Sequence, residues 1–291
     1  MLTAIIWGVA FVFQRVGMDT IEPITFNAAR MSTGAIFVVI VSSISDIANK
    51  KRKTDKVEER KTLKNTLIGG SICGVLLTAA SIVQQIGLVH TSAGKAGFIT
   101  AMYMLLVPIF NLLIFKKRGN ARIWISVIIG LVGMYLLCVK EEFILTTGDI
   151  LIFICAILFS GHILCCDKFA PKSDPIKMSA IQFVITAVLS WIIAFIAEEP
   201  SIEKIISATV PILYCGILSG GVGYTLQIVG QKHTDPTAAS IIMSLEAVFA
   251  VIAGVLLLHE KMTLQEIIGC IIMFAAIILI QLPSKEEKRS E

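Results

Sequence analysis

Charged residues are scarce in this chain. Asp, Glu, Lys and Arg together make up 16% of its 291 residues, whereas hydrophobic residues make up 56% and the mean hydropathy is +0.84. Soluble domains carry about 25% charged residues, so this composition excludes an ordinary soluble fold. Polar stretches long enough to fold in water are also missing, which excludes a sizeable extramembrane domain for signalling or assembly.

Runs of mostly apolar residues take up almost all of the sequence. About twenty such residues form a helix long enough to cross the hydrocarbon core of a bilayer. Ten runs of about this length are expected to form membrane-spanning helices: Leu2–Gly17, Ile24–Ser45, Leu67–Val89, Ala93–Phe115, Ile123–Val139, Asp149–Cys166, Ile176–Ala197, Thr209–Gln231, Thr237–Leu258 and Leu264–Leu282. The runs lack the alternation of apolar and polar residues that is typical of barrel strands. The sequence therefore predicts an all-α polytopic membrane protein with ten transmembrane helices.

Basic residues are unevenly divided between the two sides of such a bundle. Nineteen of them fall after the even-numbered runs, including the cluster between Lys50 and Lys64, whereas five fall on the opposite side. By the positive-inside rule, we expect a protein of the cytoplasmic (inner) membrane with both termini in the cytoplasm. Acidic residues interrupt the Lys50–Lys64 cluster and aromatic residues are absent from it, which favours contact with membrane lipids over binding of nucleic acid.

Seven cysteines all fall inside the apolar runs, where they behave as small apolar residues. No pair has the spacing of zinc ligands, and we expect neither a metal nor another cofactor. The first run starts directly after Met1 and lacks a small-residue cleavage site, so it is interpreted as a retained helix and not as a signal peptide. A native N-terminus upstream of Met1 would account for the missing polar leader.

Two segments of the chain match each other at an offset of 143 residues. QQIGLVHTSAGKAG and LQIVGQKHTDPTAAS carry Gln, His, Thr and Ala at equivalent positions, and each is followed by an apolar run and a charged turn. Each half holds five runs, and because five is odd, the second half crosses the membrane in the opposite orientation. Inverted repeats are typical of secondary transporters, whose substrate site lies between the two halves near the midplane.

These segments resemble those of a known family. IIWGVAFVFQRVGMD, PITFNAARM and QQIGLVHTSAGKAGFITAMYMLLVPIF in the first half, and LQIVGQKHTDPTAASIIMSLEAVFAVIAGVLLLHEKMTLQEIIG in the second, are similar to signatures of the EamA family of the drug/metabolite transporter superfamily. The resemblance covers essentially the whole chain. It implies one repeat over residues 1–140, a second over 148–283 and a cytoplasmic tail over 284–291, and it implies translocation of a small metabolite.

Two positions depart from the family pattern. The glutamate that is usual in the charged turn is Lys117 in the first half, although Glu260 is present in the second. A proline often follows the Leu-Glu pair of the ninth helix, and this chain has Ala247 there. We therefore expect a ninth helix that is straighter than in relatives.

Glu246 is the strongest candidate for a functional side chain. It lies about ten residues into the ninth run, roughly 15 Å deep, where a carboxyl group is costly and usually marks a transport pathway, a proton site or an ion pair. Tyr103 is its counterpart at the offset of 143 residues, and we expect the two side chains to meet across a midplane cavity. The structural alternative is a protonated Glu246 that only bonds a neighbouring helix.

Other polar side chains on helices one, three, four, six, eight and nine complete the predicted cavity. The expected substrate-binding residues are Trp7, Gln85, Thr100, Tyr103, His162, Tyr224, Gln227, Ser244 and Glu246, with Gln14 and Gln84 near them. Helix packing is the alternative for the glutamines and for His162. Arg30 is expected to be structural, because its long side chain can reach the external interface; the alternative is that it pairs with Glu22, Asp19 or the substrate. Helices five and ten carry few polar residues and are expected at the periphery.

Transport is the function that these features favour. We expect a secondary transporter that exports a small metabolite, either amino-acid-like or drug-like, by alternating access, with proton coupling and a monomer or homodimer as its assembly. The alternative is an integral-membrane enzyme or flippase that acts on a lipid or an isoprenoid-linked substrate. No HExxH motif, paired-aspartate motif or nucleophile-and-base constellation supports an enzyme.

Overall fold

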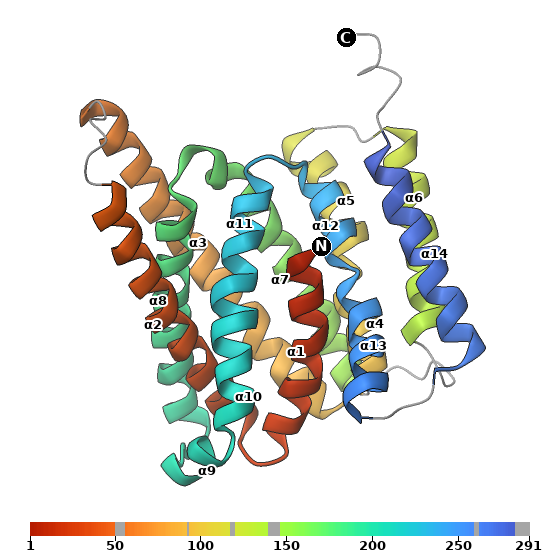
Figure 1. Cartoon of the computed structure of the whole chain (residues 1–291), viewed down its shortest axis with the longest axis horizontal. Coiled ribbons are helices and arrows are strands. Elements are labelled where there is room, and N and C mark those ends of the chain that lie inside the picture. The colour runs from red at the N-terminus through yellow and green to blue at the C-terminus, as the bar shows by residue number, and fades with distance from the viewer. Residues whose placement is uncertain (50–55, 92, 117–119, 139–145, 259–261, 283–291) are drawn as a thin grey trace.

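The computed structural model is a bundle of helices (Figure 1). It describes residues 1–49, 56–91, 93–116, 120–138, 146–258 and 262–282, and within these ranges it contains no β-strand. Some sequence expectations concern residues that lie outside the described ranges: Lys50 to Lys53, Lys117, Glu260 and the tail 284–291.

All ten expected spans are helical. The first half comprises α1 (Leu2–Met18), α2 (Pro23–Asn49), α3 (Lys56–Val89), α4 (Ala93–Thr100), α5 (Tyr103–Phe115) and α6 (Ala121–Cys138). The second half comprises α7 (Thr147–Phe169), η1 (Ala170–Lys172), α8 (Pro175–Ala197), α9 (Ile202–Ser207), α10 (Thr209–Leu213), η2 (Tyr214–Tyr224), α11 (Thr225–Gln231), α12 (Pro236–Met243), α13 (Glu246–Leu258) and α14 (Leu264–Gln281). Among the described residues, eight segments are long and apolar enough to cross a membrane, and α1 and 121–137 are shorter apolar helices. The prediction of an all-α membrane fold is confirmed, with eight spans of full length and two shorter apolar helices among the described residues.

Capping boxes start two helices at the same end of the bundle (Figure 1). Thr146 and Asp149 form one box at the start of α7, and Thr263 and Glu266 form the other at the start of α14. In each box, a threonine hydroxyl accepts a backbone N–H of the first turn while the acidic side chain accepts the N–H of the threonine. These bonds satisfy donors that have no partner within the helix, which is why both helices begin where they do.

The fourth and ninth spans are each broken near their middle. α4 and α5 are separated by Ala101 and Met102, and α12 and α13 are separated by Ser244 and Leu245. At both breaks, backbone N–H groups bond to the carbonyl three residues earlier instead of four. The expectation of a ninth helix that is straighter than in relatives stays a prediction, but the span is interrupted here although Ala247 stands in place of the usual proline. The Ser244 hydroxyl donates to the carbonyl of Ile241, 2.7 Å away, and so satisfies a carbonyl at the break.

The eighth span contains a long π-helical segment. η2 covers 11 residues between α10 and α11. Its glycines meet bulky neighbours: a Cβ on Gly221 would lie 2.5 Å from the ring of Phe37, and a Cβ on Gly223 would lie 2.6 Å from Trp7 Nε1. π-helical turns are rare and are often found at functional sites, so this segment marks the middle of the eighth span as a candidate part of the functional site.

The fifth and tenth spans pack against each other at one edge of the bundle, where the sequence analysis expected them. Figure 1 shows α6 and α14 side by side at the right. The contact is close because both helices present glycine: an added Cβ on Gly133 would lie 2.8 Å from Met273 N, and one on Gly269 would lie 2.7 Å from the Gly133 carbonyl oxygen. Small residues are what allow membrane helices to approach so closely.

Gly269→Ala should destabilise this pair. The new methyl group would overlap backbone atoms of α6, which cannot move without separating the helices, and overpacking of this kind costs about 1–3 kcal/mol. The measurement is the temperature at which the detergent-purified protein loses its monodisperse elution peak. Gly230→Ala is the matched control, because it makes the same change in a helix where a Cβ meets nothing within 4 Å. Equal midpoints for the two variants would contradict the assigned contact.

Candidate functional site

A cavity of about 50 Å³ lies between the two halves, where the breaks in the fourth and ninth spans meet the π-helical segment. Seven of the nine side chains expected from sequence line it: Trp7, Thr100, Tyr103, His162, Tyr224, Gln227 and Glu246. They come from helices one, four, six, eight and nine, and Gln84 adds helix three. Described residues of the peripheral helices α6 and α14 do not line it.

Tyr103 and Glu246 form the central polar contact of the cavity. The Tyr103 hydroxyl donates to Glu246 Oε1 at 3.1 Å, and the two side chains are 3% and 6% exposed. Tyr103 is the first residue of α5 and Glu246 is the first residue of α13. The break in each repeat therefore brings one member of the pair to the cavity, and the amino end of α13 is a favourable place for a carboxylate.

Aromatic rings form one wall of the cavity. Trp7 Nε1 donates to the carbonyl of Ser219 at 3.0 Å, and the Trp7 ring lies 4.7 Å from that of Tyr224. His162 meets Tyr224 edge to face at 5.8 Å. Such a wall can contact an apolar group or, through the faces of the rings, a cation.

Arg30 also lines the cavity, although the sequence favoured a structural role for it and left contact with the substrate as the alternative. Its side chain is 5% exposed and does not extend to the interface. Its Nε and one terminal nitrogen both donate to Asn27 Oδ1, at 3.1 and 2.8 Å, and Asn27 in turn donates to Ser81 and Ser190. Within the described ranges, no carboxylate forms an ion pair with Arg30. Because Arg30 and Glu246 both line the cavity, a positive charge and a carboxyl group face the same space.

Two expected site residues do not line the cavity. Gln85 is fully buried and its amide donates to Gln14 Oε1 at 2.8 Å, so it joins α3 to α1. Its neighbour Gln84 lines the cavity instead and approaches Thr100 Oγ1 at 3.4 Å. Adjacent helical positions point about 100° apart, which is why only one of the two glutamines can face the cavity. Ser244 does not line the cavity either, because its hydroxyl bonds to the carbonyl of Ile241 at the break in the ninth span.

A larger hollow of about 360 Å³ lies between the end of α1 and the end of α3. Its lining includes Arg15, Asp19 and Thr91, together with Phe11. Phe11 also lines the central cavity, so its ring stands between the two spaces. The hollow lies at the end of the bundle that carries the loop between α1 and α2, and we call it the vestibule.

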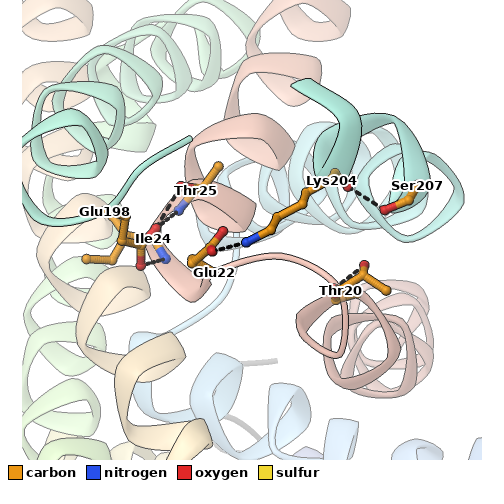
Figure 2. A network of polar contacts seen from close by, with 8 residues as sticks. Thr20, Glu22, Ile24, Thr25, Glu198, Lys204 and Ser207 are labelled. Atoms are coloured by element: carbon orange, nitrogen blue, oxygen red, sulfur yellow. Dashed lines mark hydrogen bonds and ion pairs between the residues drawn. The ribbon is translucent and has the colours of Figure 1, made fainter. Parts of the chain in front are cut away.

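A polar network ties the two halves together at this same end (Figure 2). Glu198, which follows α8, accepts the backbone N–H groups of Ile24 and Thr25 at 2.9 and 2.7 Å and also the Thr25 hydroxyl. It thereby caps the start of α2 from the opposite repeat. Lys204 forms an ion pair with Glu22 and donates a hydrogen bond to its carboxyl group. This hydrogen bond lowers the pKa of the Glu22 carboxyl group below its ordinary value.

The comparison with known proteins agrees with this architecture. The model of the EamA-like transporter family matches the chain over residues 1–139 and again over 146–282. The chain belongs to the EamA-like transporter family. As a family member it is a multi-pass membrane protein, and the family indicates transport of a solute and not enzymatic catalysis.

Two relatives match this EamA-like transporter over nearly its whole length. An uncharacterized transporter from Archaeoglobus fulgidus is 27% identical, covering 97% of this chain and 84% of the relative. The uncharacterized transporter YoaV from Bacillus subtilis is 22% identical, covering 94% of this chain and 92% of YoaV. A protein of known crystal structure matches with a TM-score of 0.78 at 16% identity, over 99% of this chain and 96% of that chain, and so shares its fold.

Proposed function

We propose that this EamA-like protein is a secondary transporter that exports a small amino-acid-like metabolite by alternating access. The observation that carries the proposal is the Tyr103–Glu246 contact in a cavity between two inverted repeats. Both side chains start the second part of a broken helix. Broken helices that meet near the midplane are the usual substrate sites of transporters built from such repeats.

The charges of the cavity favour a zwitterionic solute. Arg30 supplies a guanidinium group, which binds carboxylates through two parallel hydrogen bonds. Glu246 and the Tyr103 hydroxyl supply acceptors for an ammonium group, and the rings of Trp7 and Tyr224 supply an apolar surface for a side chain. An α-amino acid or a close analogue carries all three of the matching groups.

The cavity must open for such a solute to enter. Its volume of about 50 Å³ holds only a few water molecules and is too small for such a solute. We propose that the halves 1–140 and 148–283 exchange their conformations and expose the cavity to each side in turn. The contacts of Glu198 with the start of α2 join the two halves and would have to break for the vestibule side to open.

Proton coupling is assigned to Glu246. A carboxyl group can carry a proton across the cavity as it moves between the two exposed conformations, and intramembrane carboxyl groups in transporters commonly do so. The charged and titratable side chains that line the same cavity are Arg30, Tyr103, His162, Cys215 and Tyr224. The Tyr103 hydroxyl donates a hydrogen bond to the carboxyl group, so it stabilises the carboxylate that remains after a proton leaves.

We propose that the protein lies in the cytoplasmic membrane with both termini and the loop around Lys53 in the cytoplasm. The basis is the excess of nineteen basic residues over five between the two sides. Single cysteines introduced as Lys56→Cys and Asn120→Cys should be protected from membrane-impermeant thiol reagents in intact cells. Glu199→Cys, next to Glu198 in the sequence, should react. The opposite labelling pattern would reverse the orientation.

An untargeted comparison of metabolites tests the transport proposal. Cells that lack the protein should accumulate the exported solute, and cells that overproduce it should release that solute into the medium. The same solute should then move across proteoliposomes that contain the purified protein alone. A chemically altered lipid or isoprenoid in the first experiment, with no solute moved in the second, would favour the enzyme or flippase alternative.

A further inference from the structure

Three soft-metal donors come together beside the cavity. Cys73 of α3 and His162 and Cys166 of α7 each offer a ligand atom, and these atoms lie within 4.8 Å of one another. All three residues are 0% exposed. Among the described residues, this is the group of histidine, cysteine and acidic side chains with the spacing of a metal site.

Two of the three distances in this cluster are close to the edges of a tetrahedral zinc site, and the third is within 4.8 Å. Zinc–sulfur bonds of about 2.3 Å and zinc–nitrogen bonds of about 2.0–2.1 Å give sulfur–sulfur edges of about 3.8 Å and sulfur–nitrogen edges of about 3.6 Å. The two sulfur atoms of Cys73 and Cys166 are 3.7 Å apart, and Cys166 Sγ is 3.9 Å from His162 Nδ1 and 3.8 Å from His162 Nε2. Small side-chain movements would therefore complete the geometry.

The surroundings support coordination through His162 Nδ1. His162 Nε2 lies 3.1 Å from Gln182 Oε1, an acceptor that would hold the proton on Nε2 and leave Nδ1 free for a metal. A histidine ligand usually donates its second N–H to such an outer partner, which fixes the orientation of the ring. Gln182 is also 0% exposed and comes from a third helix, α8.

Charge balance selects the ion. Two thiolates and a neutral imidazole around a divalent cation make a neutral complex, which can be buried within a membrane protein at the least electrostatic cost. Thiolate and imidazole ligands are those that zinc prefers over magnesium or calcium. Binding of Zn²⁺ releases the two thiol protons, so that charge and atoms balance.

We propose that Cys73, His162 and Cys166 bind one Zn²⁺ ion that joins α3 to α7 behind the transport cavity. Cys165 lies in the same buried cluster as Cys73 and Cys166 and offers a further thiol near the proposed ion. His162 both lines the cavity and belongs to the cluster, so the ion holds its imidazole in place at the cavity wall. The site is independent of the choice of solute.

Metal binding to the purified full-length protein tests the site. The protein is reduced with a non-thiol reductant, stripped with a chelator, and titrated with Co²⁺ and then with Zn²⁺. We expect one Zn²⁺ per chain after gel filtration, and with Co²⁺ the intense absorption of thiolate-to-metal charge transfer and of tetrahedral coordination. Zn²⁺ should abolish that absorption. Metal-free wild-type protein after the titration would overturn the proposal.

Variants in two different helices separate coordination from adventitious binding. Cys73→Ser in α3 and Cys166→Ser in α7 should each lower the affinity for Co²⁺ at least tenfold and remove the charge-transfer band. Cys270→Ser in the peripheral helix α14 is the matched control and should bind as the wild type does. Elution as a single monodisperse peak checks the fold of each variant. Equal metal binding by all three variants would reject the site. The site would also be rejected if the unreduced protein contains a Cys73–Cys166 disulfide and the reduced protein takes up no Zn²⁺.

Discussion

Glu246→Gln should reduce solute transport by at least about tenfold, a change of about 1.4 kcal/mol, while leaving the protein folded. The glutamine oxygen can still accept the hydrogen bond of Tyr103, so the buried contact in the closed cavity is kept. The amide can neither carry a proton nor neutralise the ammonium group of a solute. We also expect the pH dependence of transport to flatten, because the titrating carboxyl group is gone. Proteoliposome uptake over a range of external pH values measures both effects.

Two further variants show whether this effect belongs to the cavity. Glu203→Gln makes the same chemical change on the exposed helix α9 and should transport normally. Tyr103→Phe removes only the hydroxyl donor and should retain a pH-dependent rate. Normal transport with an unchanged pH profile in Glu246→Gln would leave this carboxyl group with a structural role alone.

Arg30→Lys should raise the KM for the transported solute by roughly tenfold or more, with a smaller change in maximal rate. Lysine keeps the positive charge, but it lacks the planar fork that binds a carboxylate with two hydrogen bonds and cannot bond Asn27 as Arg30 does. The effect should depend on the solute: an analogue without the carboxylate should show a similar, high KM with both proteins. Uptake kinetics in proteoliposomes provide the comparison.

Arg60→Lys is the matched control, because Arg60 is exposed near the start of α3 and far along that helix from the cavity-lining Gln84. Its KM should equal that of the wild type. Thermal stability measured on the same preparations separates loss of binding from loss of fold. An unchanged KM in a stable Arg30→Lys protein would remove the carboxylate site and return Arg30 to the structural role that the sequence suggested.

The central pair of the site could be predicted from the sequence because it follows from the repeat. Tyr103 and Glu246 are related by the offset of 143 residues, and an inverted repeat brings equivalent positions to equivalent depths. The other polar residues were predicted from span and depth. That information gives the depth of a side chain in the membrane but not the direction in which it points. For this reason the sequence did not show that Gln84, and not Gln85, lines the cavity.

Arg30 shows the limit of arguments from depth alone. A long basic side chain some distance from the helix end is compatible both with an interface position and with a polar cavity, and the sequence signals do not distinguish them. Asn27, three residues earlier and so on the same face of α2, is the one local signal that could have indicated a buried guanidinium site. The sequence did not indicate the cluster of Cys73, His162 and Cys166, because Cys73 comes from a helix that is distant in sequence from the other two residues.

The number, length and inverted order of the spans were determined by the sequence itself, because the bilayer requires about twenty apolar residues for each crossing and charged loops mark its sides. Contacts between helices were decided only by the tertiary structure. These helices are apolar on most of their surface, so periodicity does not show which face meets lipid and which meets another helix. The breaks at Ala101 and Ser244, the π-helical segment and the meeting of Arg30 with Glu246 in one cavity all depend on the packing of both repeats together.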